Sequence, residues 1–175
     1  MIRLWVLILS TCLAFSVVFA ESTKKQDGKS IFGWVEQVSL ELDDTSIELK
    51  AKLDTGAKSS SLHAENVRSF KCDCDDGDHV LFDVTDADGT IHTLKRKVKR
   101  YVKIKRHQSE YDRRPTVLMN VCIGAVSKEI EVNLVDRNRF LYPLLLGRTA
   151  LIDDAIIDPG NTFLNRASCH SSPTE

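Results

Sequence analysis

Apolar and polar residues alternate with a period of two along most of this chain. The alternation is clearest in four segments, 46–53, 80–84, 91–98 and 116–123. A period of two is typical of strands that bury one face and expose the other. The pattern therefore predicts a β-rich protein.

Turn residues divide these segments into hairpins. Asp-Gly pairs at 76–77 and 88–89 are hairpin signals, and Gly124 separates two strand-like segments. Only 149–155 has the pattern of a helix, and no internal repeat or linker interrupts the chain. We expect one all-β domain over residues 31–164, with a single short helix near its C-terminal end.

The N-terminus has the features of a signal peptide. Arg3 is followed by an apolar run to residue 20 that ends in Val18-Phe19-Ala20, a small-residue spacing suited to signal peptidase. Cleavage would leave an exported protein, periplasmic or secreted, that meets the membrane only transiently. An uncleaved membrane anchor and a lipoprotein cleavage site at Cys12 are the alternatives.

Both ends of the mature chain are polar. Residues 21–30 are expected to be a disordered leader, and residues 165–175 a flexible tail. Removing residues 1–20 leaves four cysteines, an even number that suits disulfides in an oxidising compartment. They are Cys72, Cys74, Cys122 and Cys169. Their connectivity stays open, although two cysteines one residue apart are the least suited to pair.

Charge is balanced overall but segregated locally. The net charge of −1 gives no global field for a nucleic acid or an anionic membrane. An acidic stretch, 73–88, is followed by a basic one, 95–106. We expect the two stretches to pair across neighbouring strands, with a polyanion site in the basic stretch as the alternative.

The most informative short segment is 53–57, Leu-Asp-Thr-Gly-Ala, directly after the strand-like residues 47–52. A strand would deliver the Asp54 carboxylate to a turn, where Gly56 allows close backbone approach and the Thr55 hydroxyl can bond locally. Read alone, the triplet is weak evidence for catalysis, because Asp-Thr-Gly occurs in many proteins as an ordinary turn. About ninety residues later an apolar segment ends in Gly147-Arg148.

Together these blocks resemble a bacterial retropepsin-like family often labelled "ATP-dependent zinc protease". The similarity covers nearly the whole mature chain, through Gly33-Trp34, segments 50–64 and 144–151, and Asp158-Pro159-Gly160. The resemblance implies a closed, acid-protease-like β-barrel, a homodimer and an aspartic endopeptidase. It also implies that Ala57 belongs to the active-site loop and that Gly147 and Arg148 support it.

Peptide hydrolysis of this type needs two carboxylates that share one proton. One Asp-Thr-Gly triplet per chain means that two subunits would each supply Asp54 to a peptide or protein substrate. Asp158-Pro159-Gly160 has Pro159 where a threonine is needed, so we expect a turn there. Lys58 would lower the pKa of Asp54 if its side chain faced the carboxylate.

A hairpin flap should cover the substrate. We place it in the charged segment 105–114, at His107, Gln108, Ser109 and Glu110, with an ordinary solvated loop as the alternative.

No metal or cofactor is expected. The family label is not supported by this sequence, which has neither a Gly-x-x-x-x-Gly-Lys phosphate loop nor a His-Glu-x-x-His pair. A cluster of Cys72, Cys74 and His79 suits disulfide formation better than zinc, and 86–89 lacks the glutamate of a calcium loop. His63 is expected to be structural, and no partner for a nucleophile can be assigned to the serines at 59–61.

Two other functions compete with peptidase activity. The first is a non-catalytic dimeric binding or regulatory module on the same fold, accessory to the glutamate-ligase or transglutaminase-like systems with which the family is associated. The second is a metal-dependent hydrolase.

Overall fold

The computed structural model describes residues 25–26, 28–42, 45–72, 76–105 and 111–169. Nearly all regular structure is β. In chain order the elements are β1 (Lys25–Gln26), β2 (Lys29–Gly33), β3 (Val35–Glu41), β4 (Ser46–Asp54), β5 (Ser60–His63), β6 (Glu65–Lys71), β7 (Asp78–Thr85), β8 (Ile91–Lys97), β9 (Arg100–Lys105), β10 (Tyr111–Ile123), β11 (Val126–Val135), β12 (Leu144–Gly147), α1 (Arg148–Leu151) and β13 (Ala155–Asp158).

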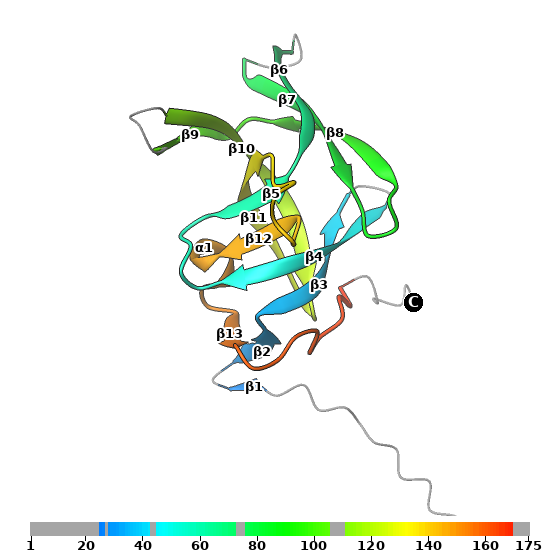
Figure 1. Cartoon of the computed structure of the whole chain (residues 1–175), viewed down its shortest axis with the longest axis vertical. Coiled ribbons are helices and arrows are strands. Elements are labelled where there is room, and N and C mark those ends of the chain that lie inside the picture. The colour runs from blue at the N-terminus through cyan, green and yellow to red at the C-terminus, as the bar shows by residue number, and fades with distance from the viewer. Residues whose placement is uncertain (1–24, 27, 43–44, 73–75, 106–110, 170–175) are drawn as a thin grey trace, which may run out of the picture.

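The main sheet closes on itself. Its order is β11-β5-β12-β4-β3-β10-β9, and β10 also pairs with β11, so six of the strands form a ring from which β9 extends. Closure leaves no unpaired edge within the ring. The predicted closed β-barrel is confirmed, and Figure 1 shows its strands around a common interior.

Two three-stranded sheets flank the barrel. One has the order β6-β7-β8 and stands above it in Figure 1, and the other, β1-β2-β13, lies below. The predicted hairpin turn at Asp88-Gly89 joins β7 to β8, where Gly89 has a φ of +93°. Gly124, with a φ of +55°, likewise turns β10 into β11.

The core follows the alternation seen in the sequence. On β4, Ile47, Leu49, Ala51 and Leu53 are all at most 3% exposed, whereas the intervening residues face outward. The same strand therefore presents Asp54 on its outer face. This is how an apolar strand carries a carboxylate to the surface.

The helix is shorter than predicted. We expected it over 149–155, but α1 spans Arg148–Leu151, and Ala155 begins β13. The reason is tertiary: β13 pairs in parallel with β2, with Ile156 opposite Ile31. The turn expected at Asp158 is present, because its Oδ1 accepts a hydrogen bond from Gly160 N at 2.8 Å.

The expected pairing of the two charged stretches is wrong in register. Strands β7 and β8 are neighbours, but Leu81 lies opposite Lys95 and Asp83 opposite Thr93. Asp83 accepts a hydrogen bond from the Thr93 hydroxyl at 2.6 Å. Hairpin geometry fixes this register, because the turn after β7 sets Thr85 opposite Ile91 and thereby every later pair.

The segment after β13 returns across the barrel as a strap, which we define as residues 159–169. The Glu36 carboxylate, fully buried, accepts hydrogen bonds from three backbone N–H groups, those of Gly33, Leu164 and Asn165. A disulfide joins Cys169 to Cys122 on β10. The described residues of the segment expected to be a flexible tail are thus anchored.

Among the described residues, no helix is both long and apolar enough to cross a membrane. Residues 1–24, which contain the predicted signal peptide, lie outside them.

Candidate active site

Asp54 is the last residue of β4 and opens the candidate catalytic loop, residues 54–58. Strand β12 runs parallel to β4 in this region, with Gly147 directly beside Asp54. Two sequence blocks almost a hundred residues apart therefore lie on neighbouring strands of one sheet. The side chain of Asp54 is 25% exposed.

The two oxygens of the Asp54 carboxylate have different partners. Oδ1 accepts hydrogen bonds from the backbone N–H groups of Gly56, at 2.9 Å, and Ala57, at 3.2 Å. Oδ2 contacts the Lys52 ammonium group at 3.1 Å. The Lys52 contact is the main cause that lowers the pKa of Asp54; burial opposes it, and the hydrogen bonds from Gly56 and Ala57 lower the pKa further.

Gly147 is required by a close backbone approach. A Cβ atom built on it would lie 2.6 Å from the carbonyl oxygen of Ser59 and 2.7 Å from its carbonyl carbon. The glycine therefore lets β12 pack directly against the segment that follows the catalytic loop.

Arg148 holds the loop from the other side. Its Nη1 donates to the carbonyl oxygens of Thr55, at 3.0 Å, and Gly56, at 2.8 Å. Its backbone N–H donates to Ala57 O at 2.9 Å. The predicted supporting role of Gly147 and Arg148 thus has a concrete geometry in this structure.

Lys58 is bound to the neighbouring helix through its backbone. Its carbonyl oxygen accepts hydrogen bonds from Thr149, through both the backbone N–H and the hydroxyl. The side chain is exposed, and the cation that lowers the pKa of Asp54 is Lys52.

The serines at 59–61 are structural. Asn133 Nδ2 donates to Ser59 Oγ at 3.2 Å and to Ser60 O at 3.0 Å, and its Oδ1 accepts from the Thr116 hydroxyl at 2.7 Å. The Ser60 hydroxyl in turn accepts from Gly147 N at 3.2 Å. A buried polar network therefore connects β10 and β11 to the back of the catalytic loop.

Arg137, after the end of β11, is a buried cation near this loop. Only 7% of the residue is exposed, and its Nη1 donates to Ser61 Oγ at 2.8 Å. Burial lowers the pKa of Arg137 and the nearby Arg114 lowers it further, whereas Asp54 raises it. None of the ion pairs within the described part of the chain includes Arg137.

His63 has the structural role expected of it. Its Nδ1 accepts a hydrogen bond from the backbone N–H of Arg137 at 2.9 Å, and its Nε2 lies 3.6 Å from Glu65. The imidazole thereby fixes the start of the loop after β11.

The predicted flap falls partly within a hairpin. Strands β9 and β10 pair with each other, from Arg100 opposite Thr116 to Lys105 opposite Tyr111. The two strands extend from the barrel on the side of α1 in Figure 1. His107, Gln108, Ser109 and Glu110 lie outside the described residues.

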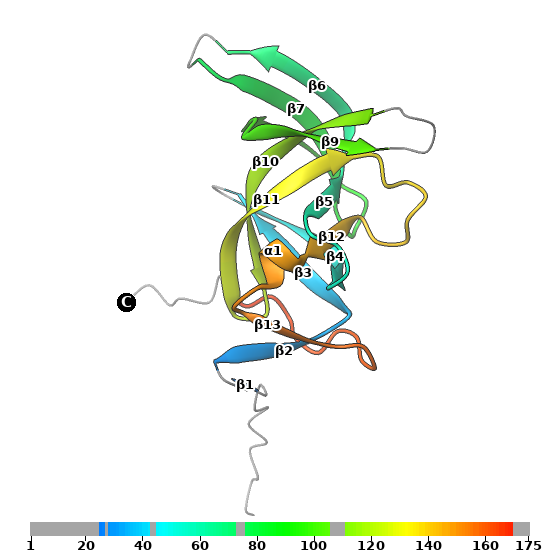
Figure 2. The ribbon, with the colours of Figure 1, turned by 90° about the vertical axis from the view of Figure 1, so that its left-hand side faces the viewer.

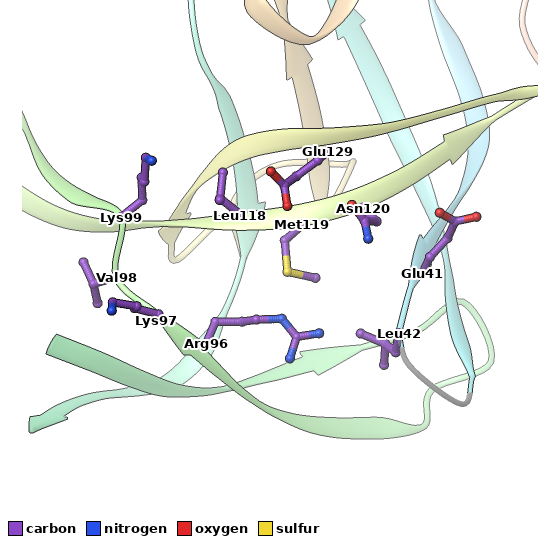
Figure 3. A pocket seen from close by; sticks show the side chains of 10 residues that line it. All are labelled: Glu41, Leu42, Arg96, Lys97, Val98, Lys99, Leu118, Met119, Asn120 and Glu129. Carbon is purple, nitrogen blue, oxygen red and sulfur yellow. The ribbon is translucent and has the colours of Figure 1, made fainter. Parts of the chain in front are cut away.

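A cavity of about 620 Å³ lies away from Asp54, between the middle of β10 and the segment that includes the end of β8, and Figure 3 shows the Met119 side chain directed toward Arg96. Glu41 lines its other end and pairs with Ser46, eight residues before Asp54 on β4. At roughly 3.3 Å per residue this end is about 26 Å from the catalytic loop.

No metal site is formed by the described residues. Their one group of three potential ligands is Glu41, Cys122 and Cys169, and its two sulfur atoms form a disulfide. Cys72 is also disulfide-bonded, which removes it from the zinc cluster considered above.

Sequence reasoning missed Lys52 and Arg137. Lys52 could have been found, because a residue two positions before Asp54 on a strand shares its face. Arg137 had no such signal, since only the barrel brings the loop after β11 to Ser61.

Three comparisons show which known proteins this chain resembles in sequence and in fold. A family model described as RimB-like, "Retropepsin-like aspartic endopeptidase RimB", matches residues 31–168. A solved structure of a protein of unknown function from Legionella pneumophila subsp. pneumophila str. Philadelphia 1 is 41% identical, with a TM-score of 0.64; the match covers 76% of this chain and 95% of that one.

Curated relatives carry another name. A "Probable alpha-L-glutamate ligase" of Shewanella pealeana is 30% identical over 116 residues, which are 66% of this chain and 25% of the relative. A protein of the same name from Desulfotalea psychrophila is 31% identical over 114 residues, 63% of this chain and 24% of the relative. The match thus spans about a quarter of the length of these relatives.

Proposed function

The chain belongs to the RimB-like family of retropepsin-like aspartic endopeptidases, and we propose that it hydrolyses peptide bonds with two aspartates, Asp54 from each of two subunits. The observation that carries the proposal is the geometry of the catalytic loop. Backbone N–H groups fix one carboxylate oxygen of Asp54, and Arg148 fixes the loop itself. These hydrogen bonds orient the carboxylate through Oδ1 and make no use of Oδ2.

A second subunit would complete the site. Among the described residues, the end of β4, helix α1 and strand β13 lie on one face of the molecule, the face toward the viewer in Figure 2. Thr55, which directly follows β4, is an exposed residue. Strand β13 is an edge of its sheet, so it has backbone groups available for a symmetry-related copy.

In the dimer, one proton is shared by the two Asp54 carboxylates. The ionised carboxylate takes a proton from a water molecule, which attacks the carbonyl carbon of the peptide. The protonated carboxylate donates a hydrogen bond to the carbonyl oxygen and supports the charge that develops there. When the tetrahedral intermediate collapses, its C–N bond breaks and the leaving nitrogen takes the proton that the first carboxylate removed from water. We assign the exclusion of bulk water to the hairpin of β9 and β10, because these strands flank the predicted flap segment.

Hydrolysis of a diverse peptide library between about pH 4 and pH 8 tests this function. Asp54→Asn should lower kcat/KM by at least about a hundredfold, and a chelator should have no effect. Activity that survives Asp54→Asn but is lost with the chelator would instead establish a metal-dependent hydrolase.

Mixing the two forms tests the shared site. At constant total protein, activity should fall with the square of the wild-type fraction as Asp54→Asn protein is added, because mixed dimers have one functional aspartate. A linear fall would show that each chain acts alone.

A non-catalytic dimeric module is the second candidate, and the contact between Lys52 and Asp54 favours it, because a cation occupies the oxygen that should meet water. Since relatives are named glutamate ligases, such a module would be accessory to a glutamate-ligase system. A folded dimer that cleaves no peptide over the whole pH range would support this candidate.

We further propose substrates that carry carboxylate side chains near the scissile bond. Arg137 is buried without an ion-pair partner among the described residues, and Arg114 lies near enough to lower its pKa. Arg114 shares a face of β10 with Thr116, which reaches the network behind the catalytic loop. Peptides with glutamate should be cleaved faster than their glutamine counterparts, and Arg114→Gln should reduce that preference.

Export is proposed from the N-terminal sequence, and the disulfide between Cys122 and Cys169 supports an oxidising compartment. Cell fractionation and N-terminal sequencing of the mature protein test it. A cytoplasmic protein that still starts at Met1 would contradict it.

A further inference from the structure

Lys52 is the charged group in closest contact with the candidate catalytic carboxylate. It precedes Asp54 by two residues on β4, so both side chains lie on the outer face of the strand. Its Nζ lies 3.1 Å from Asp54 Oδ2. The inference below rests on the proposed function, because it concerns the same carboxylate.

The contact is selective between the two oxygens. Oδ1 is saturated by the N–H groups of Gly56 and Ala57, so Oδ2 is the oxygen left for a water molecule, a shared proton or a second Asp54. Lys52 binds this second oxygen. In the single subunit, Lys52 therefore occupies the carboxylate oxygen that should take part in the reaction.

The other cations near the loop are placed differently. Arg148 directs its guanidinium to the carbonyl oxygens of Thr55 and Gly56, and the Lys58 side chain is exposed. Arg137 is bound to Ser61, with Arg114 as its cationic neighbour. Among the described residues, none of these four forms an ion pair with Asp54, so Lys52 is the cation that contacts its carboxylate.

We propose that Lys52 is a positioning residue of the aspartic dyad, which keeps Asp54 ionised and covered in the single subunit and confines hydrolysis to acidic pH. An ammonium group beside a carboxylate stabilises its charged form. The dyad then loses its shared proton at a lower pH than it would without Lys52. Since the singly protonated dyad is the active form, its window moves toward acid.

The contact can also open. The Lys52 side chain is 42% exposed, and ion pairs at such positions are weak and sensitive to salt. A second Asp54 or a bound substrate can therefore move the ammonium group off Oδ2 without unfolding β4, while its positive charge stays close enough to lower the pKa of the dyad. Lys52 thus occupies Oδ2 of Asp54 in the single subunit and leaves that oxygen when the dimer or the substrate complex forms.

The test compares Lys52→Met with Lys50→Met. Methionine keeps most of the lysine stem and removes the charge. Lys50 is a matched control because it lies on the same face of β4, but its Nζ is 6.0 Å from the Phe163 ring and has no contact with Asp54. Two quantities are measured for each full-length variant, the titration of the Asp54 carboxyl by ¹³C NMR and the pH dependence of kcat/KM for peptide hydrolysis.

Lys52→Met should make Asp54 titrate at higher pH and should move the falling limb of the kcat/KM profile to higher pH. On that limb, the variant should exceed the wild type by on the order of tenfold for each pH unit of displacement. Lys50→Met should leave both curves at their wild-type positions.

Three outcomes separate this inference from the peptidase proposal. If Lys52→Met changes neither the titration nor the profile, or if Lys50→Met shifts both equally, the assigned role of Lys52 is wrong. A folded Lys52→Met variant that is inactive at every pH would make Lys52 part of the catalytic machinery and overturn the covering role. If no variant cleaves peptides but Asp54 still titrates higher in Lys52→Met, the ionisation role stands and the peptidase proposal fails.

Discussion

The disulfide between Cys122 and Cys169 should be a major source of stability, and replacing both cysteines by alanine measures its contribution. The bond ties the strap to β10, next to two hydrogen bonds that Ser168 makes with Gly124 O. Without it, the C-terminal segment would be held mainly by the bonds to Glu36.

The expected magnitude follows from chain entropy. The bond joins residues 47 apart in sequence. Closing a loop of that length in the unfolded chain removes conformational freedom equivalent to about 4 kcal/mol at 25 °C. We expect the free energy of unfolding to fall by about that amount, which is a large fraction of the roughly 5–15 kcal/mol typical of a domain.

Equilibrium unfolding in urea, followed by far-UV circular dichroism under non-reducing conditions, measures the change. Dithiothreitol added to the double variant then reports the separate effect of the Cys72 disulfide, because the variant lacks the other bond. A loss below about 1 kcal/mol would refute the entropic argument, since the loop length alone requires more.

Three further substitutions test the packing around the site. Gly147→Ala should lower the free energy of unfolding by about 3 kcal/mol, because its Cβ would meet the backbone of Ser59, and thermal unfolding with the peptidase assay would show both effects. Glu36→Ala should cost about 3–6 kcal/mol, since three N–H donors lose their acceptor, and a loss under about 1 kcal/mol in urea unfolding would contradict this. Asn133→Ala should cost about 2–3 kcal/mol and reduce peptidase activity at pH values where the protein is still folded, because the donors to Ser59 and Ser60 O are lost; unchanged activity would show that the network does not position the loop.

Much of the fold was predictable because strand alternation is local. The apolar positions of β4 were visible as alternate letters, and they are the buried ones in the structure. Gly89 and Gly124 marked turns because each needs a positive φ. The closed barrel itself came from resemblance, since alternation alone does not say which strands pair.

The errors occurred where partners distant in sequence decide the outcome. Ala155 was predicted to be helical, but it belongs to β13, which pairs with β2. Lys95 was expected to face a carboxylate, but it lies opposite Leu81. Register depends on hairpin geometry and on the shared burial of whole strands, which outweigh single charge pairs at a solvated surface.

For the candidate site, the sequence by itself determined the chemistry and the local loop. Asp54 follows an apolar strand, Gly56 permits its turn, and the N–H groups that bind its Oδ1 come from the next three residues. Only the tertiary structure decided what surrounds that carboxylate. Closing the barrel sets Gly147 beside Asp54 and brings Arg137 to Ser61, because strands far apart in the chain complete one another's hydrogen bonds.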